Sequence, residues 1–342
     1  MPYHLPSHYL LTPSMQAFVD EQAASLEPKL IDGPTGSGKS LLACVLHERG
    51  PRRKRRLRQL ACGTLEPSLA DAQLFGVVKG AFTGAERDRP GFLEGTDGGT
   101  FVLNDIDLLR PGVQAKLLGF LDTGRYTPVG SVEERQADVH LIATTNRNPE
   151  QLVAEGCLRE DLYGRLSFVR FTCPPLAVRT DIRALAPIVL RNVWTARPNR
   201  GADAPEAHEP RLTPHALDVI AAHGWWPLNI RGLAQVLGDC MASAVDGSVN
   251  ARTVRRCLGE REAMWERMAR QAAPRARTRR YRRSGTHEDE KRMMEEALRR
   301  TGGNVTAAAE RSGMSRTAFW YKLKEHGIER VSVLENKDGS GV

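Results

Sequence analysis

The spacing of apolar and polar residues in the first half of the chain alternates between helical and extended patterns. Residues 13–29 carry apolar side chains on roughly one helical face and have Pro13 near their start, which predicts a helix. Residues 100–107 and 138–145 are apolar and β-branched, which predicts strands. Alternating strands and helices up to about residue 172 indicate the α/β class, with a parallel sheet covered by helices on both faces.

The second half of the chain has a different pattern. Residues 180–265 predict only helices, with a loop rich in Pro, Ala and Gly at residues 197–210. Residues 270–286 are basic and poor in apolar side chains, which is typical of a linker. We therefore expect a leader at 1–12, an α/β subdomain at 13–172, a helical lid subdomain at 173–267, a basic linker at 268–287, a small all-α domain at 288–330 and a tail at 331–342.

The composition restricts the class of protein. With 342 residues, of which 41% are hydrophobic, the chain is long enough for a large and a small domain. It has no secretory signal at its start and no apolar run of the roughly 18 residues that a membrane span needs, so we expect a cytoplasmic protein. Six scattered cysteines and nine histidines form no metal-ligand spacing, which argues against any metal site except one for Mg²⁺.

The basic charge gives a weak indication of the partner. A formal net charge of +8 and a pI of about 9.4 favour a polyanion. We interpret the basic run at residues 52–58 as a solvated surface turn, with DNA contact as the less favoured alternative. A second basic run, residues 275–283, lies in the linker and either attracts DNA phosphates or only keeps the linker soluble.

A phosphate-binding loop follows the first apolar strand pattern. Its residues match G-x-x-x-x-G-K-[ST] and are Gly33, Pro34, Thr35, Gly36, Ser37, Gly38, Lys39 and Ser40, followed by Leu41. The glycines let backbone N–H groups turn toward phosphate oxygens, and Lys39 supplies a positive charge for the β- and γ-phosphates. The Ser40 hydroxyl can hold Mg²⁺. A chance Gly-rich turn is disfavoured because an apolar strand precedes the loop and a helix pattern follows it.

A hexapeptide downstream of the phosphate loop gives the chain a family resemblance. Its residues are Gly80, Ala81, Phe82, Thr83, Gly84 and Ala85. Together with the phosphate loop, this sequence resembles the signature of the AAA+ activators of sigma-54 RNA polymerase, the bacterial enhancer-binding proteins, and the matches run from about residue 13 to residue 330. The resemblance implies an AAA+ fold that binds ATP and Mg²⁺. It also implies that the hexapeptide projects from an ATPase ring and touches the sigma factor.

Further matches imply that sites are shared between subunits. Thr145 and Asn146 look like the family's sensor I, which responds to the γ-phosphate from a strand end. Arg159 and Arg165 look like the two arginines that reach the nucleotide of a neighbouring subunit, although a solvated helix face would also explain them. Arg231 looks like sensor II on the helical lid. Such sites imply a ring, which in this family is a hexamer.

The chain departs from the family pattern at three positions that serve hydrolysis. Asn104 stands where an aspartate holds the Mg²⁺ shell, and Asp105 stands where a glutamate polarises the attacking water. Ala61 replaces the asparagine that gates this glutamate. We therefore predict ATP binding with slow or absent hydrolysis. A register shift would restore the chemistry if Asp105 and Asp107 shared one face of a strand.

The C-terminal segment resembles the Fis-type helix-turn-helix of this family. Asn304 is the expected N-cap of the first helix, and Phe319 and Leu323 are expected to face the core. The side chains predicted to contact an upstream palindromic DNA site are Ser315, Arg316, Thr317, Tyr321 and Lys322. A helical hairpin that does not bind DNA is the alternative.

These observations indicate a transcription regulator that binds ATP and upstream DNA and remodels sigma-54 RNA polymerase. One alternative is a non-hydrolysing co-subunit or inhibitor that modulates a competent homologous activator in a mixed ring. Another is an unrelated P-loop NTPase such as a helicase loader, which the intact residues 80–85 disfavour. No receiver or sensory domain is recognised before residue 13, so control is expected from abundance, a binding partner or a co-subunit.

Overall fold

The protein forms two compact units in a computed structural model. The residues described are 9–66, 68–196, 209–223, 228–243, 247–272, 287–303, 305–312, 314, 319, 322–323 and 326–328. The first unit contains residues 13–33 and 38–173. The second contains residues 9–12, Pro34–Ser37 and the described residues from 174 onward.

A five-stranded parallel sheet forms the centre of the first unit. Its strands are β1 (Lys29–Asp32), β2 (Leu57–Ala61), β3 (Thr100–Asn104), β6 (His140–Thr145) and β7 (Val169–Thr172). They lie in the order β2, β3, β6, β1, β7. The register pairs Asp32 with Thr145 on one side and with Thr172 on the other, so the carboxyl ends of these strands reach the same edge. The predicted α/β class with a parallel sheet is confirmed.

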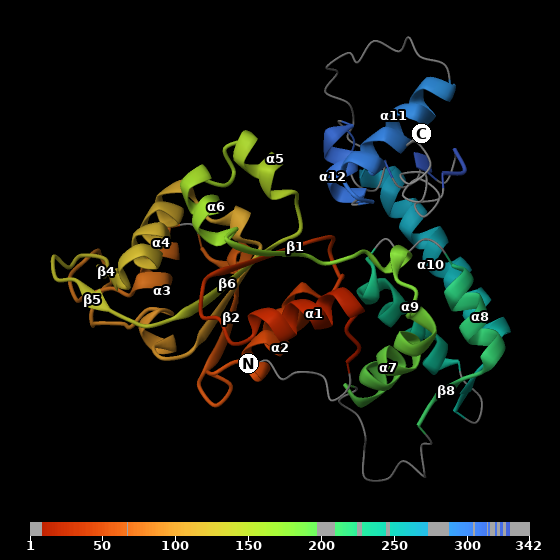
Figure 1. The fold of residues 1–342 in the computed structure, drawn as a ribbon, viewed down its shortest axis with the longest axis horizontal. Coiled ribbons are helices and arrows are strands. Elements are labelled where there is room, and N and C mark those ends of the chain that lie inside the picture. The colour runs from red at the N-terminus through yellow and green to blue at the C-terminus, as the bar shows by residue number, and fades with distance from the viewer. Residues whose placement is uncertain are drawn as a thin grey trace. The chain divides into compact units, whose positions relative to one another are not determined.

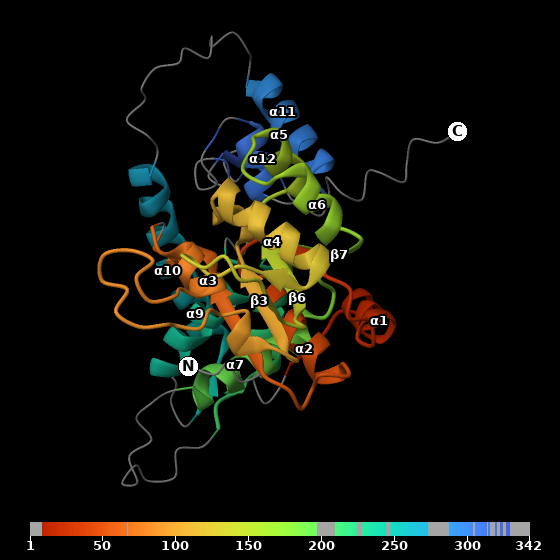
Figure 2. The ribbon, with the colours of Figure 1, turned by 90° about the vertical axis from the view of Figure 1, so that its left-hand side faces the viewer.

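Helices cover both faces of this sheet (Figures 1 and 2). They are α1 (Pro13–Gln22), α2 (Lys39–Arg49), α3 (Ala70–Phe75), α4 (Pro111–Thr123), α5 (Pro149–Ala154) and α6 (Glu160–Leu166). Leu30 and Leu103 point to the face that packs on α3, α4 and α6. Their neighbours Ile31 and Val102 are equally buried and alternate to the face that α2 covers.

Two predicted elements are longer than the observed ones. The predicted helix 13–29 ends at Gln22, before β1 begins. The predicted strand 100–107 ends at Asn104, because Asp105 takes the left-handed conformation (φ 58°, ψ 58°) and a 3₁₀ turn follows. Asp105 and Asp107 therefore do not share a strand face, and the register-shift alternative is wrong.

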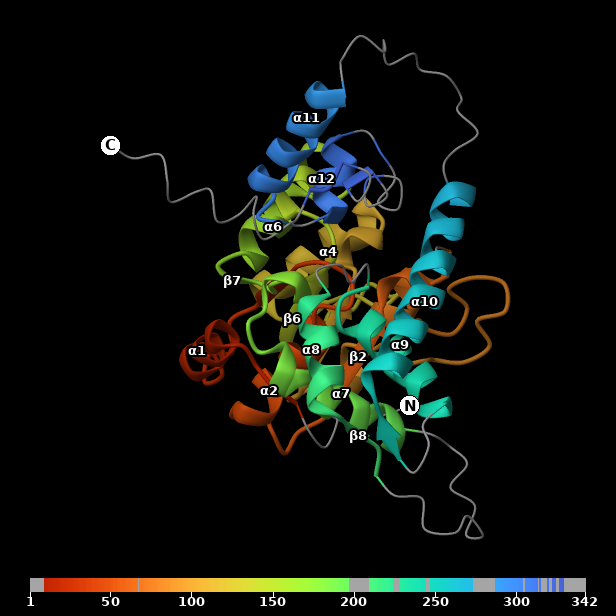
Figure 3. The same cartoon turned by 90° about the vertical axis from the view of Figure 1, so that its right-hand side faces the viewer.

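The second unit is mainly helical (Figure 3). Its elements are α7 (Ile182–Thr195), β8 (Arg211–Leu212), α8 (Pro214–Ala222), α9 (Ile230–Ala242), β9 (Ser248–Val249), α10 (Ala251–Ala272), α11 (His287–Arg300) and α12 (Val305–Arg311). Residues 180–265 were expected to be only helical, but β8 and β9 pair as two-residue parallel strands. Helices α7 to α10 share one core, and α11 and α12 share another with Phe319 and Leu323, which are fully buried as predicted.

A buried polar cluster lies where the sheet strands begin. Lys29 is fully buried, and its Nζ donates to the carbonyl oxygens of Ser25 at 2.7 Å and Glu27 at 3.0 Å. The same Nζ lies 3.3 Å from Nε2 of His140. Burial lowers the pKa of Lys29 to about 8. Burial, together with the neighbouring Lys29 charge, lowers the pKa of His140 to about 3. The native state therefore disfavours a charged His140.

This cluster predicts a loss of stability in mild acid. An unfolded histidine binds a proton below a pH of about 6.5, whereas native His140 does so only near pH 3. His140 should therefore reduce the free energy of unfolding by about 2 kcal/mol between pH 7 and pH 5. Urea unfolding at both pH values measures this loss, and His140→Gln should make the difference smaller by a similar amount. An equal pH dependence in both proteins would contradict the expectation.

Candidate functional site

The phosphate loop between β1 and α2 has the backbone shape that its glycines predict. Gly33, Gly36 and Gly38 have φ values of 136°, 77° and 105°, which L side chains rarely adopt. A Cβ added to Gly33 would lie 2.6 Å from the carbonyl oxygen of Cys173, and one added to Gly36 would lie 2.0 Å from that of Leu228. These positions therefore require glycine.

The loop is built to receive an anion. Lys39 is the first residue of α2, and its Nζ donates to the Gly33 carbonyl at 2.8 Å across the loop. Ser37 is 1% exposed, and its Oγ has no hydrogen-bond partner among the described residues. A buried hydroxyl without a partner is costly unless a ligand completes it. With the N-terminus of α2 directed at the same place, the loop fits a phosphate group.

Three neutral oxygen-bearing side chains meet beside the loop. Ser40 Oγ donates to Asn104 Oδ1 at 2.8 Å, and Thr144 Oγ1 donates to the same oxygen at 3.2 Å. Hydroxyl and amide oxygens are ligand types that Mg²⁺ accepts, directly or through water. Ser40 and Asn104 therefore fit a phosphate-bound Mg²⁺, although Asn104 brings no negative charge to it.

The predicted sensor residues contact the carboxylates that follow β3. Asn146 Nδ2 donates to Asp105 Oδ1 at 3.2 Å, and Thr145 Oγ1 donates to Asp107 Oδ1 at 2.7 Å. Ala61 lies opposite Asn104 in the register of β2 and β3, and its methyl group can make no hydrogen bond. The carboxylate of Asp105 is therefore hydrogen-bonded by Asn146, while Ala61 has no side-chain donor to offer it.

The two predicted trans-acting arginines stand at the ends of α6. Arg159 pairs with both carboxylate oxygens of Asp161, at 3.0 and 2.7 Å, and these hydrogen bonds raise the pKa of Arg159. Arg165 pairs with Glu27 at 3.2 Å and with Asp122 at 3.5 Å. Both guanidinium groups are therefore engaged in surface ion pairs within the chain.

Two residues near these arginines were missed by sequence reasoning. Gln114 is fully buried on α4, and its Oε1 accepts from the Arg159 backbone N–H at 2.9 Å. Arg170 on β7 donates from Nε to Asp32 at 2.8 Å, next to the start of the phosphate loop. A charged residue in an otherwise strand-like pattern was the available signal for Arg170, and no local signal indicated the contact of Gln114.

Residues 80–85 form a closed loop on the surface of the first unit. The Gly80 N–H donates to the Ala85 carbonyl at 2.8 Å, and the Ala85 N–H donates to the Phe82 carbonyl at 3.0 Å. Phe82 is 43% exposed, and Thr83 is also exposed. The turn thus holds an aromatic side chain in solvent, which is the arrangement of a contact loop.

A hairpin braces this loop from the side. It consists of β4 (Arg125–Tyr126) and β5 (Arg135–Gln136). The Val78 N–H donates to the Val129 carbonyl at 3.1 Å. A Cβ on Gly130 would lie 2.4 Å from Cβ of Ala81, so the hairpin and the hexapeptide are in close contact.

Arg231 is exposed in the first turn of α9, in the second unit. Its Cβ lies next to Gly36, since a Cβ on that glycine would be 3.1 Å away. The predicted sensor II residue and the middle of the phosphate loop therefore belong to the same unit.

Lys322 is the one predicted DNA contact that belongs to the described residues. Ser315, Arg316, Thr317 and Tyr321, together with the expected cap Asn304 and the basic linker run, lie outside the described residues. Lys322 is described, and its Nζ pairs with Glu290 on α11, which also lies 3.2 Å from Nε2 of His326. This lysine is therefore held within its own domain.

The basic turn at residues 52–58 is only partly a solvated surface. Arg53, Lys54 and Arg55 are exposed as expected. Arg52 differs, because its side chain is 11% exposed and pairs with Asp138 at 2.6 Å. The solvated-turn interpretation is therefore wrong for Arg52, which ties this turn to the loop before β6.

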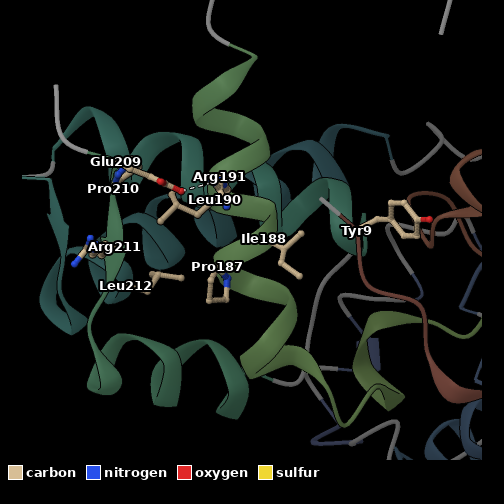
Figure 4. A pocket seen from close by; sticks show the side chains of 9 residues that line it. All are labelled: Tyr9, Pro187, Ile188, Leu190, Arg191, Glu209, Pro210, Arg211 and Leu212. Carbon is tan, nitrogen blue, oxygen red and sulfur yellow. Dashed lines mark ion pairs between the residues drawn. The ribbon is translucent and has the colours of Figure 1, made fainter. Parts of the chain in front are cut away.

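A pocket of about 640 Å³ lies in the second unit (Figure 4). Helix α7 and residues 209–212 form most of its wall, and the Arg191–Glu209 ion pair, 2.9 Å long, connects these two segments. None of the predicted site residues lines this pocket. In the part of the chain that the structure describes, no group of three or more His, Cys, Asp or Glu side chains is placed to hold a metal, and no helix could span a membrane.

Known proteins are similar in sequence to most of this chain. The family description "Sigma-54 interaction domain" matches residues 11–172, and "Bacterial regulatory protein, Fis family" matches residues 287–326. The transcriptional regulatory protein GlrR of Escherichia coli (strain K12) is 32% identical over 304 residues, which are 88% of this chain and 63% of that relative. The transcriptional regulatory protein ZraR of Klebsiella oxytoca is 36% identical over 325 residues, 91% of this chain and 67% of the relative.

A solved structure has a similar fold. The crystal structure of NtrX from Brucella abortus in complex with ATP is 27% identical, with a TM-score of 0.62 over 95% of this chain and 70% of that chain. The chain thus spans 63% of the length of GlrR, 67% of that of ZraR and 70% of the NtrX chain. The resemblance inferred from the sequence is confirmed, and the chain belongs to the family of sigma-54-dependent transcriptional regulators, with a Sigma-54 interaction domain and a Fis-type DNA-binding domain.

Proposed function

We propose that this protein is a transcription regulator that binds ATP and Mg²⁺ at the phosphate loop and acts on sigma-54 RNA polymerase through residues 80–85. The observation that carries the proposal is the phosphate loop, whose backbone requires glycine at Gly33 and Gly36 and which contains the buried Ser37 hydroxyl, unpartnered among the described residues. The same chain exposes Phe82. Relatives support it, because NtrX has been solved in complex with ATP and in complex with ADP. The Fis-type domain would bind the protein to an upstream DNA site.

Each residue of the site has a definite task in this proposal. Lys39 would leave the Gly33 carbonyl for the β- and γ-phosphates, and the backbone N–H groups of the loop would bind phosphate oxygens. Mg²⁺ neutralises charge on the β- and γ-phosphates when it is bound. Ser40 would hold it directly, while Asn104 would orient the Ser40 hydroxyl.

Hydrolysis is proposed to be slow. Asp105 has a shorter side chain than the glutamate of the family pattern, and a displacement of about 1 Å at a catalytic group can reduce a rate roughly 100-fold. Asn104 adds no charge to the metal site, and Ala61 offers no partner for a catalytic carboxylate. The end of β3 at Asn104 also leaves Asp107 bonded to Thr145 and away from a strand face shared with Asp105.

A second candidate function follows from the arginines. Arg159 and Arg165 lie on the surface, where a neighbouring subunit can approach them. A chain with intact arginines and a poor hydrolysis site suits a mixed ring, in which it donates both side chains to a competent homologous activator. The same assembly would let it act as an inhibitor if its own site stalls the ring.

Restoring the family residues should increase ATP turnover. Asn104→Asp/Asp105→Glu returns the metal-site charge and the missing methylene, so we expect turnover to rise by about 100-fold. Steady-state phosphate release by both proteins measures the change. ATP affinity, measured by calorimetry, serves as the control and should change much less. The impaired-hydrolysis proposal fails if the wild type already turns over as fast as the double variant.

The exposed hexapeptide should be required for binding to the sigma factor. Thr83→Ala removes a hydroxyl from the exposed turn, and we expect it to weaken binding to isolated sigma-54 by about tenfold or more. Thr195→Ala, at an exposed threonine on α7, is the matched control and should bind normally. A pull-down or interferometry titration with ATP present gives the two affinities. Unchanged binding by Thr83→Ala would remove residues 80–85 from the contact surface.

The mixed-ring candidate depends on the arginines. Arg159→Ala/Arg165→Ala should lower the ATP turnover of a mixture with a competent homologous activator by at least about tenfold, because such arginines stabilise charge in the transition state. The matched control is Arg53→Ala/Arg55→Ala in the exposed basic turn, which should leave turnover unchanged. If the wild-type chain never changes the partner's turnover, the mixed ring is excluded.

A further inference from the structure

Asn229 stands out in the second unit because a buried polar side chain sits on a strained backbone. It immediately precedes α9 and is 2% exposed. Its backbone angles, φ 52° and ψ −131°, belong to a region that residues other than glycine adopt only at a cost. Such a conformation persists when its surroundings require it. Sequence reasoning assigned a role to Arg231 in this segment and none to Asn229.

Both polar atoms of the Asn229 side-chain amide are hydrogen-bonded. Its Nδ2 donates to the Thr35 carbonyl at 2.9 Å, and its Oδ1 accepts from the Leu176 N–H at 2.8 Å. The next residue continues the contact, since the Ile230 N–H donates to the Gly36 carbonyl at 3.0 Å. Two successive carbonyls in the middle of the phosphate loop are therefore fixed from one side, by residues of the same unit.

Fixing the Thr35 carbonyl also fixes the Gly36 N–H, whereas the Ser37 N–H donates to the Pro34 carbonyl within the loop at 3.2 Å. In a trans peptide the carbonyl of one residue and the N–H of the next point in opposite directions. The bond from Asn229 to the Thr35 carbonyl therefore turns the Gly36 N–H away from Asn229. A phosphate loop works through N–H groups turned toward the anion and carbonyls turned outward. The carbonyl of Leu228 closes against Gly36, which keeps the outer side of the loop packed.

We propose that Asn229 is a positioning residue for nucleotide binding, which holds the middle of the phosphate loop with the Gly36 N–H toward the phosphates. The proposal rests on the proposed function, because it needs a nucleotide at this loop. Asn229 acts through the loop backbone and is not assigned a contact with the nucleotide. Its second bond, to the Leu176 N–H, anchors the amide so that Nδ2 faces Thr35.

The variant that isolates this role is Asn229→Asp. An aspartate has the same shape and keeps the acceptor for Leu176, but when ionised it presents an oxygen, in place of a donor, to the Thr35 carbonyl. The dissociation constants of ATP and ADP should both rise by about tenfold or more at pH 7.5, because a buried carbonyl loses its partner. Fluorescent analogues of both nucleotides, titrated without a need for turnover, measure the constants.

The pH profile separates positioning from a general structural defect. A protonated aspartate regains an O–H donor, so the affinity gap between Asn229→Asp and the wild type should narrow as the pH falls from 7.5 to 5.5. The matched control is Asn250→Asp, at the exposed N-terminus of α10, where the carboxylate can replace the oxygen that accepts from the Thr253 N–H. This control should bind nucleotide like the wild type at every pH.

A second variant covers the case in which the aspartate prevents folding. Asn229→Gly accepts the backbone angles without strain and removes both side-chain bonds. It should lose about tenfold or more in affinity for both nucleotides, with a gap to the wild type that does not depend on pH. Binding within twofold of the wild type by either variant, or a pH-independent defect in Asn229→Asp, overturns the proposal. If the wild type itself binds no nucleotide, the proposed function fails first and this inference fails with it.

Discussion

The carboxyl ends of β1, β3 and β6 meet at one edge of the parallel sheet, and the candidate nucleotide residues of the first unit depend on that meeting. The register that sets Asp32 beside Thr145 also brings the start of the phosphate loop beside the sensor residues. A parallel sheet buried on both faces fixes this register strongly, since a one-residue slip would turn Leu30 and Leu103 to the wrong face. Packing of the apolar core therefore determines the positions of the polar side chains of the candidate site.

The side chains beside the phosphate loop at that edge are mostly uncharged, although the proposed Mg²⁺ is a divalent cation. The uncharged side chains of Ser40 and Thr144 both donate a hydrogen bond to Asn104. The carboxylates that follow β3, those of Asp105 and Asp107, accept hydrogen bonds from the predicted sensor residues Asn146 and Thr145. The loop thus has the geometry to bind a phosphate, while Ser40 and Asn104, the proposed Mg²⁺ residues, carry no negative charge. This combination is the physical basis of the proposed slow hydrolysis, since nucleotide binding needs hydrogen-bond donors around the phosphates, while hydrolysis also needs a correctly placed carboxylate.

Local patterns were sufficient to predict the phosphate loop, the central strands and the buried pair Phe319 and Leu323, while the exposure of the hexapeptide was expected from the family resemblance. The end of β3 was not predicted, because polar and apolar residues alternate past Asn104 as they would in a strand, whereas Asp105 adopts the left-handed conformation that aspartate tolerates. The roles of Gln114 and Asn229 also escaped, because each depends on a backbone group far away in the sequence. Arg52 was misjudged for the same reason, since its partner Asp138 lies before a different strand.

The ion pair between Arg165 and Glu27 has a consequence for assembly. In the proposed ring, Arg165 would have to exchange this acid of its own subunit for a neighbour's phosphate, so that one charge pair would replace another. When no nucleotide is present there is no phosphate to replace Glu27, so the exchange would add no affinity, and the exposed ion pair that it would break is itself worth little. It becomes favourable when a polyphosphate, with its higher charge, occupies the adjoining subunit. Nucleotide occupancy would then decide whether subunits cohere, and ionic strength would shift the threshold.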